Sequence, residues 1–157
     1  MGFDLRTLSG LAYLDAVTTL LQRARSEQPT AGLWEAADFQ WWWRKPRDTD
    51  SWDQLFWFDT SGSPVAAAVV TDWGGSFALD VIVLPSVDLG REVSRRGLEM
   101  LGGVVSTIEV LVDDRDTFMA SLLTDADLHR GRTRMPLLGC RPGRARTCRA
   151  YQLDTPC

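Results

Sequence analysis

The chain is poor in cysteine, histidine and tyrosine, and the scarcity of the first two excludes a class of chemistry. All 3 cysteines, Cys140, Cys148 and Cys157, lie near the C-terminus, where their spacing fits neither a zinc knuckle nor a disulfide-stapled core. His129 is the single histidine. The sequence therefore predicts no metal site. A body that needs no disulfide is typical of a reducing cytoplasm.

Long apolar runs are also absent. No stretch approaches the roughly 18 apolar residues of a membrane span. The first residues, MGFDLRTLSG, include an acid and lack the apolar region of a signal peptide. We therefore expect a cytoplasmic protein without a membrane partner.

Basic residues are scarce outside the C-terminal stretch. Seven arginines follow His129, against the single acid Asp154. The chain before His129 therefore holds 10 of the 17 basic residues and 20 of the 21 acidic ones. An acidic body argues against nucleic acid as the partner of the folded part. A basic arm that binds nucleic acid stays open as an alternative for the C-terminal stretch.

Tryptophan, by contrast, is abundant and concentrated. Six of the 7 tryptophans lie between Leu33 and Phe58, including the run Trp41, Trp42 and Trp43. Three consecutive indoles cannot all face one core in a helix or a strand, so at least one is expected to face a groove, a partner or solvent. The run is either an oversized corner of the core or a contact surface for a second copy of the chain or another domain.

The apolar patterns predict a single α/β domain of ordinary size. Strands are expected at 2–8, 55–58, 64–72, 76–84 and 107–112, and helices at 11–26, 33–43, 90–102 and 115–123. Turn residues at 59–64 and at Gly74-Gly75 separate the middle strands. The run Val81 to Leu84 is apolar on both faces, as in a covered central strand. The late strand-helix-strand passage implies a parallel pair with a right-handed crossover.

This order, with a hairpin leading into a buried strand that ends VxLP and opens on a helix, resembles the GCN5-related N-acetyltransferase (GNAT) superfamily over residues 1–128. The stretches ADFQWWWR, FWFDTSGSPVAAAVVTDWG, LDVIVLP and VLVDDRD are similar to the amino-terminal domains of actinobacterial two-domain members. The resemblance implies an α/β (α+β), acyl-CoA N-acyltransferase-like fold, a mixed, splayed sheet with helices on both faces. It also implies acetyl transfer from acetyl-CoA to a small-molecule or peptide amine.

The resemblance places the acetyl-CoA pyrophosphate on the loop after the central strand, where the family carries Q/R-x-x-G-x-G/A. Counted from Pro85, Asp88 falls on the Q/R position and Val93 on the last small position. A shift of one residue aligns Gly90 with the first glycine but puts Glu92 last. The motif is degenerate, and an acid close to the phosphates opposes binding. The residues that the resemblance assigns to acetyl-CoA are Leu84, Gly90, Arg91 and Arg95.

Deprotonation of the amine calls for a carboxylate or a water held by one. Asp80, within the central strand, is the candidate catalytic base and Asp72, at the end of the preceding strand, the alternative. Either residue could also be an edge or cap residue without a catalytic role. Many family members protonate the leaving thiolate with a tyrosine of the last helix, but the only tyrosines here are Tyr13 and Tyr151. The alternative function is a catalytically silent GNAT-fold domain that acts as a binding or regulatory module.

Residues 129–157 depart from the family, whose members close the fold with two further strands. The stretch HRGRTRMPLLGCRPGRARTCRAYQLDTPC lacks alternation, and only Tyr151 to Leu153 has strand character. We therefore expect a GNAT-like domain at 1–128 and a basic, Arg- and Cys-rich tail at 129–157 that adds little to the core. A frame-shifted ending and a true basic arm both remain open as explanations.

Overall fold

The computed structural model describes residues 2–29, 34–45, 48–72, 77–101, 107–113, 116–125, 129–136 and 147–154. In chain order the elements are β1 (Asp4–Leu8), α1 (Gly10–Glu27), α2 (Ala36–Trp42), a short 3-10 helix (Asp48–Ser51), β2 (Gln54–Phe58), β3 (Pro64–Asp72), β4 (Phe77–Val83), α3 (Gly90–Leu101), β5 (Thr107–Asp113), α4 (Thr117–Asp125), β6 (His129–Pro136) and β7 (Thr147–Asp154). Every strand and helix expected before residue 124 is present. The turn expected at Gly74-Gly75 lies outside the described residues, as do Cys140 and Cys157.

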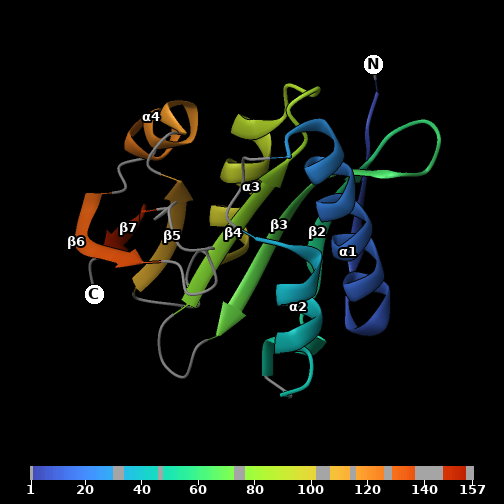
Figure 1. Cartoon of the computed structure of the whole chain (residues 1–157), viewed down its shortest axis with the longest axis horizontal. Helices are drawn as coiled ribbons and strands as arrows, with labels where there is room; N and C mark the ends of the chain where they lie inside the picture. The colour runs from blue at the N-terminus through green and yellow to red at the C-terminus, as the bar shows by residue number, and fades with distance from the viewer. Residues whose placement is uncertain are drawn as a thin grey trace.

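The strands form one mixed sheet in the order β1-β2-β3-β4-β5-β7-β6. Strands β1 to β4 pair antiparallel, β4 pairs parallel with β5, and β7 and β6 follow antiparallel (Figure 1). The predicted hairpin, the central strand and the parallel pair across a helical crossover are confirmed, and the fold class with them. A membrane-spanning helix is not found among the described residues.

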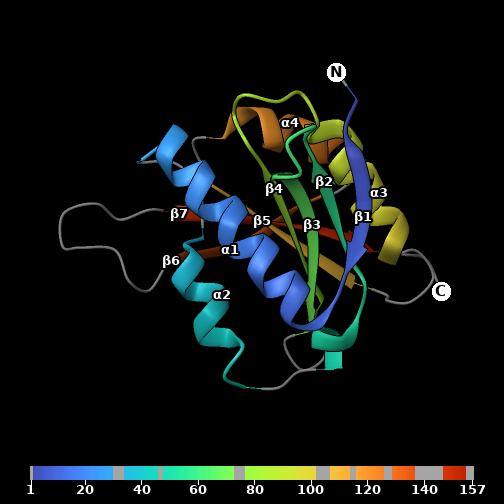
Figure 2. The same ribbon diagram turned by 90° about the vertical axis from the view of Figure 1, so that its right-hand side faces the viewer.

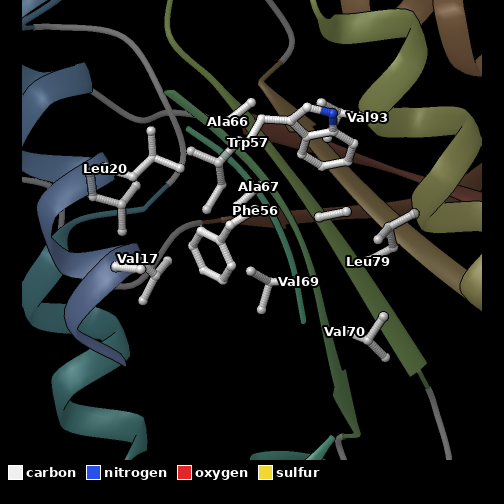
Figure 3. Packing of buried hydrophobic residues seen from close by; sticks show 14 of the residues in the cluster. Val17, Leu20, Phe56, Trp57, Ala66, Ala67, Val69, Val70, Leu79 and Val93 are labelled. Carbon is white, nitrogen blue, oxygen red and sulfur yellow. The ribbon is translucent and has the colours of Figure 1, made fainter. Parts of the chain in front are cut away.

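Helices cover both faces of the sheet. Figure 2 shows α1 and α2 on one face and α3 on the other. Strand β3 lies between these layers, and all of its residues from Pro64 to Thr71 are buried. In Figure 3, Phe56 and Val69 point toward Val17 of α1, whereas Trp57 and Leu79 lie on the side of α3. The layers follow from the alternation of side chains along each strand.

Glycine brings α3 unusually close to the sheet. A Cβ at Gly97 would lie 2.9 Å from Cδ1 of Leu79 and 3.1 Å from Cβ of Ala68. The alanines of β3 leave room for this approach, because their side chains end at Cβ. The same side of the sheet is therefore packed without space for a larger residue at position 97.

The sheet is splayed between β4 and β5. The parallel pairing of the two strands is limited to Phe77 with Ile108 and Ala78 with Glu109, near the start of each strand. Further along, β4 continues to pair with β3 and β5 with β7. The two strands therefore diverge toward their carboxyl ends, as Figure 1 shows. Helix α3 follows β4 from this open end.

Strands β6 and β7 correct the expectation for the C-terminal stretch. Strand β7 pairs with β5 from Thr107 opposite Asp154 to Asp113 opposite Cys148, and β6 pairs with β7. Strand structure is not confined to Tyr151 to Leu153, so the expectation of strand character only there is wrong. Main-chain pairing needs no apolar alternation, which is why the pattern missed it.

Candidate functional site

Asp80, the predicted base, lies in the middle of β4 opposite Val69 of β3. Its residue is only 5% exposed. The indole Nε1–H of Trp34 donates a hydrogen bond to Asp80 Oδ1 at 2.9 Å. Trp34 immediately precedes the capping residue of α2, so the carboxylate is held from a different element, on the face of the sheet that α1 and α2 cover.

Local sequence explains why Trp34 is placed there. The main-chain N–H of Glu35 donates to the Asp38 carboxylate at 2.8 Å, and the Glu35 side chain accepts from the first turn of α2 in return. This reciprocal capping fixes the start of the helix. Arg25 of α1 also binds the Glu35 carboxylate, which ties the two helices together. Trp34 is the residue just before this anchored helix start.

Asp72 is not brought to the same place. It lies at the end of β3 opposite Phe77, whereas Asp80 lies opposite Val69. Successive strand residues alternate between faces, and Asp72 is an odd number of residues from Val69, so it belongs to the other face of the sheet. The two predicted candidates therefore do not form a carboxylate pair.

Glu109 of β5 is a carboxylate that the sequence analysis missed. It pairs with Ala78, two residues before Asp80, and so lies on the same face as Asp80 where β4 and β5 begin to separate. Glu109 is half-buried. The pattern TIEVLV predicted the strand, but the parallel register that relates Glu109 to Asp80 is decided only by the fold.

The loop after β4 carries the residues predicted to bind acetyl-CoA. Leu84 is buried; its N–H donates to the Val65 carbonyl at 3.0 Å and its carbonyl accepts from the Val87 N–H at 3.1 Å. Gly90 is the buried first residue of α3, and Arg91 beside it is exposed. The first N–H groups of an α-helix have no acceptor within the helix, so residues 90–92 present backbone donors at its start.

The charged side chains of α3 bind one another along the helix surface. Glu92 accepts a hydrogen bond from Arg95 at 2.7 Å, and the Arg96 guanidinium lies 3.3 Å from its other oxygen. Arg95 also donates to Glu99 at 2.5 Å. The hydrogen bond from Arg95 lowers the pKa of Glu92, although burial opposes the shift. Glu92 is therefore ionised in the first turn of α3, and Arg95 is engaged by two acids.

Two further features of this region were not predicted. Glu27, the last residue of α1, accepts hydrogen bonds from the Ser86 N–H at 3.2 Å and the Ser86 hydroxyl at 3.1 Å, which ties the loop after β4 to α1. Ser94 of α3 is buried, and its Oγ has no hydrogen-bond partner among the described residues. A contact between residues 59 positions apart carries no local sequence signal.

The tryptophan run divides between core and surface. Trp41 is 63% exposed, and the Arg44 guanidinium lies 4.6 Å from the centre of its ring. Trp42 packs edge-on against Trp34 at 4.9 Å, and Trp43 lies 6.0 Å from the Tyr13 ring. The prediction that at least one ring faces outward is confirmed. The predicted role in contact with a partner is not tested by a single chain.

Several solved N-acetyltransferases have a similar structure. The ribosomal-protein-S18-alanine N-acetyltransferase from Escherichia coli has a TM-score of 0.71 at 16% identity, over 98% of this chain and 94% of its own. An N-acetyltransferase from Staphylococcus aureus Mu50 has a TM-score of 0.71 at 12% identity, over 98% of this chain and 99% of its own. A GNAT phosphinothricin acetyltransferase from Sinorhizobium meliloti, in complex with acetyl-CoA, has 0.70 at 12% identity, over 98% and 89%.

The shared region extends through the C-terminal strands, because 98% of the chain is matched in each comparison. At the level of sequence, no family model and no curated protein matches the chain.

Proposed function

We propose that this chain, whose fold is that of the GNAT N-acetyltransferases, transfers an acetyl group from acetyl-CoA to a small-molecule or peptide amine. The observation that carries the proposal is the separation of β4 from β5 beside a buried carboxylate, Asp80. The proposal places both substrates where the pairing of these two strands ends. The carboxylate supplies a proton acceptor at that place.

The start of α3 fits part of acetyl-CoA. Gly90 adds no side chain at the first helical position, and the backbone donors of residues 90–92 suit an anionic pyrophosphate. Arg91 adds a positive charge beside them, and Leu84 borders the same loop. Glu92 opposes the anion, and Arg95 is bound to acids rather than directed at the loop. We therefore expect binding through the backbone to be weaker than a complete motif would provide.

The proposed chemistry assigns one step to this chain. When bound, acetyl-CoA supplies the activated acyl group as a thioester. Asp80 takes the proton that the ammonium group of the acceptor must lose, directly or through a water, and thereby frees the nitrogen lone pair for attack. The sequence of α4, TFMASLLTD, has no tyrosine, so the thiolate does not receive its proton from the residue that many family members use.

A second candidate function is a catalytically silent GNAT-fold domain, which binds or regulates a partner without acetyl transfer. The ionised Glu92 at the helix start favours it, as does the exposed ring of Trp41. We propose that Trp41 contacts a second copy of the chain, a homodimer, or a second GNAT domain. Trp42 is a poorer test of this contact, because it packs against Trp34. Trp41→Ala should weaken self-association in sedimentation experiments without changing the melting temperature.

Calorimetry and a thiol-release assay with a panel of amines test the two candidates. We expect a dissociation constant for acetyl-CoA weaker than about 10 µM and measurable turnover. Asp80→Asn should lower turnover by about 10²-fold or more while acetyl-CoA binding is kept. Asp72→Asn is the matched control, because this residue lies on the opposite face. If millimolar acetyl-CoA gives no binding and no turnover, the result would favour the silent domain.

A further inference from the structure

We propose that Trp34 is a positioning residue for Asp80. Its indole N–H holds the Asp80 carboxylate ionised and oriented as the proton acceptor for the substrate amine. The inference rests on the proposed acetyl transfer and deepens it, because it assigns a role to a side chain outside the sheet. It is carried by one contact, Trp34 Nε1 to Asp80 Oδ1 at 2.9 Å, between residues 46 positions apart.

A buried carboxylate needs such a partner. With 5% of the residue exposed, Asp80 has little contact with water, and loss of hydration favours the protonated acid. A protonated Asp80 cannot take a proton from the amine. A hydrogen bond donated to the carboxylate favours the ionised form and offsets the burial. The indole N–H is a donor only, so it binds the carboxylate without competing for the substrate's proton.

The aromatic surroundings fix the direction of this donor. The Trp34 ring meets Trp42 edge-on, with centroids 4.9 Å apart and planes at 79°. Trp42 in turn packs against the buried Phe39 at 5.2 Å. Each ring pair restricts the side-chain rotation of the next, so the tryptophan-rich segment holds the N–H in place. This gives a role to part of the tryptophan excess that the core alone does not explain.

Several ionisable groups come from the elements packed on this face. Arg25 of α1 binds the Glu35 carboxylate, next to Trp34. Glu109 of β5 shares the face by register, and a second negative charge would favour protonation of Asp80. Tyr13 of α1 is buried against Phe56, and Asp38 of α2 is engaged by the Glu35 N–H. Strand β3 presents Ala67, Val69 and Thr71 on this face, none of which titrates near neutral pH. The hydrogen bond from the indole therefore favours the ionised carboxylate, whereas burial and the nearby negative charge favour the protonated acid.

A nuclear magnetic resonance titration tests the contact without any substrate. In the wild-type protein, the Trp34 indole N–H resonance should shift with pH together with the Asp80 carboxyl carbon, and Asp80→Asn should abolish the shift. In Trp34→Phe, which keeps a ring at the site, the midpoint of the Asp80 titration should rise by about one pH unit. Trp43→Phe is the matched control and should leave that midpoint unchanged. An unchanged midpoint in a folded Trp34→Phe protein would overturn the proposal.

The pH dependence of acetyl transfer is the second readout. The limb that requires an ionised carboxylate should move to higher pH by the same amount in Trp34→Phe, with kcat reduced and the KM for acetyl-CoA unchanged. A purely structural role of Trp34 would lower activity equally at every pH, and this result would also overturn the proposal. A protein with the expected titration but no transfer to any amine would contradict the proposed function and not the contact between Trp34 and Asp80.

Discussion

At the scale of single residues, the face on which a carboxylate lies decides what it can do. Asp72 and Asp80 occupy neighbouring strands and are chemically identical, yet only Asp80 faces the helices α1 and α2 and receives the indole N–H. Glu92 and Glu99 are a second example of two identical acids in different positions. Both bind Arg95, but Glu92 lies in the first turn of α3 and Glu99 near its end.

Glu92→Gln should strengthen acetyl-CoA binding several-fold. The substitution removes a negative charge next to the proposed pyrophosphate position and releases Arg95 and Arg96 from one of their acidic partners. Calorimetry at low and high salt is the measurement, and the gain should shrink at high salt because exposed charges are screened. Glu99→Gln is the control, since it releases the same arginines far from the helix start. An equal gain in both variants would contradict binding at the start of α3.

At the scale of elements, close packing and turn chemistry hold the sheet that carries the site. Helix α3 approaches β3 and β4 through Gly97, and the hairpin between β2 and β3 closes over Asp59. The Asp59 carboxylate accepts the Ser61 hydroxyl at 2.5 Å and the Ser63 N–H at 3.0 Å, while Arg23 of α1 reaches its other oxygen at 3.2 Å. One carboxylate thus connects a turn to a helix.

Gly97→Ala should destabilise the protein by about 1–3 kcal/mol, because the added methyl would press on Leu79 and Ala68. Alanine raises intrinsic helix stability by up to about 1 kcal/mol, so a stabilised variant would show that packing yields easily. Thermal unfolding is the measurement. In a Leu79→Ala background, Gly97→Ala should cost less than it does in the wild-type protein, and simple additivity of the two changes would argue against the contact.

Asp59→Asn should lower the melting temperature near neutral pH but not in strong acid. The hydrogen bond from the Ser61 hydroxyl, with others from the Ser63 and Ser61 N–H groups and Arg23, lowers the pKa of Asp59 from 3.8 to about 2. Because folding lowers this pKa, the ionised carboxylate stabilises the protein at pH values above the pKa of the unfolded chain, 3.8. This contribution is lost as the pH falls through the folded pKa of about 2. The difference between wild type and variant should therefore narrow between pH 4 and pH 2.

Asp4→Asn is the control for this titration. The Asp4 carboxylate forms an exposed ion pair with Arg6 at 2.7 Å, and such pairs contribute little. Its melting temperature should follow that of the wild type at every pH. A pH-independent loss in Asp59→Asn would mean that the turn depends on shape and not on charge.

At the scale of the whole molecule, the sheet depends on segments from both ends of the chain. Strand β5 is joined to β4 by only two residue pairs, whereas it pairs with β7 along its whole length. Strand β5 is therefore held in the sheet mainly by β7. The division into a GNAT-like domain at 1–128 and a tail at 129–157 stays a prediction.

Truncation after Leu128 should lower the melting temperature by many degrees or prevent folding. The shortened chain loses the main-chain partners of β5 from Thr107 to Asp113, and unpaired main-chain groups of a half-buried strand are destabilising. Circular dichroism and thermal unfolding are the measurements. Removal of residues 155–157 alone is the control and should have little effect. An unchanged melting temperature after the larger truncation would contradict this prediction and would show that residues 129–157 contribute little to stability.

The amino-acid sequence by itself determined the elements as far as α4 and the central place of β4. Turn residues, β-branched runs and helical periodicity act over a few positions, so their signal is local. It placed Asp80 within a strand and Gly90 at the start of a helix. Tertiary structure alone decided which partners meet: Trp34 with Asp80, Glu27 with Ser86, Glu109 on the face of Asp80, and β7 beside β5. These contacts join residues far apart in the chain, and they depend on strand register and helix placement, which local periodicity does not encode.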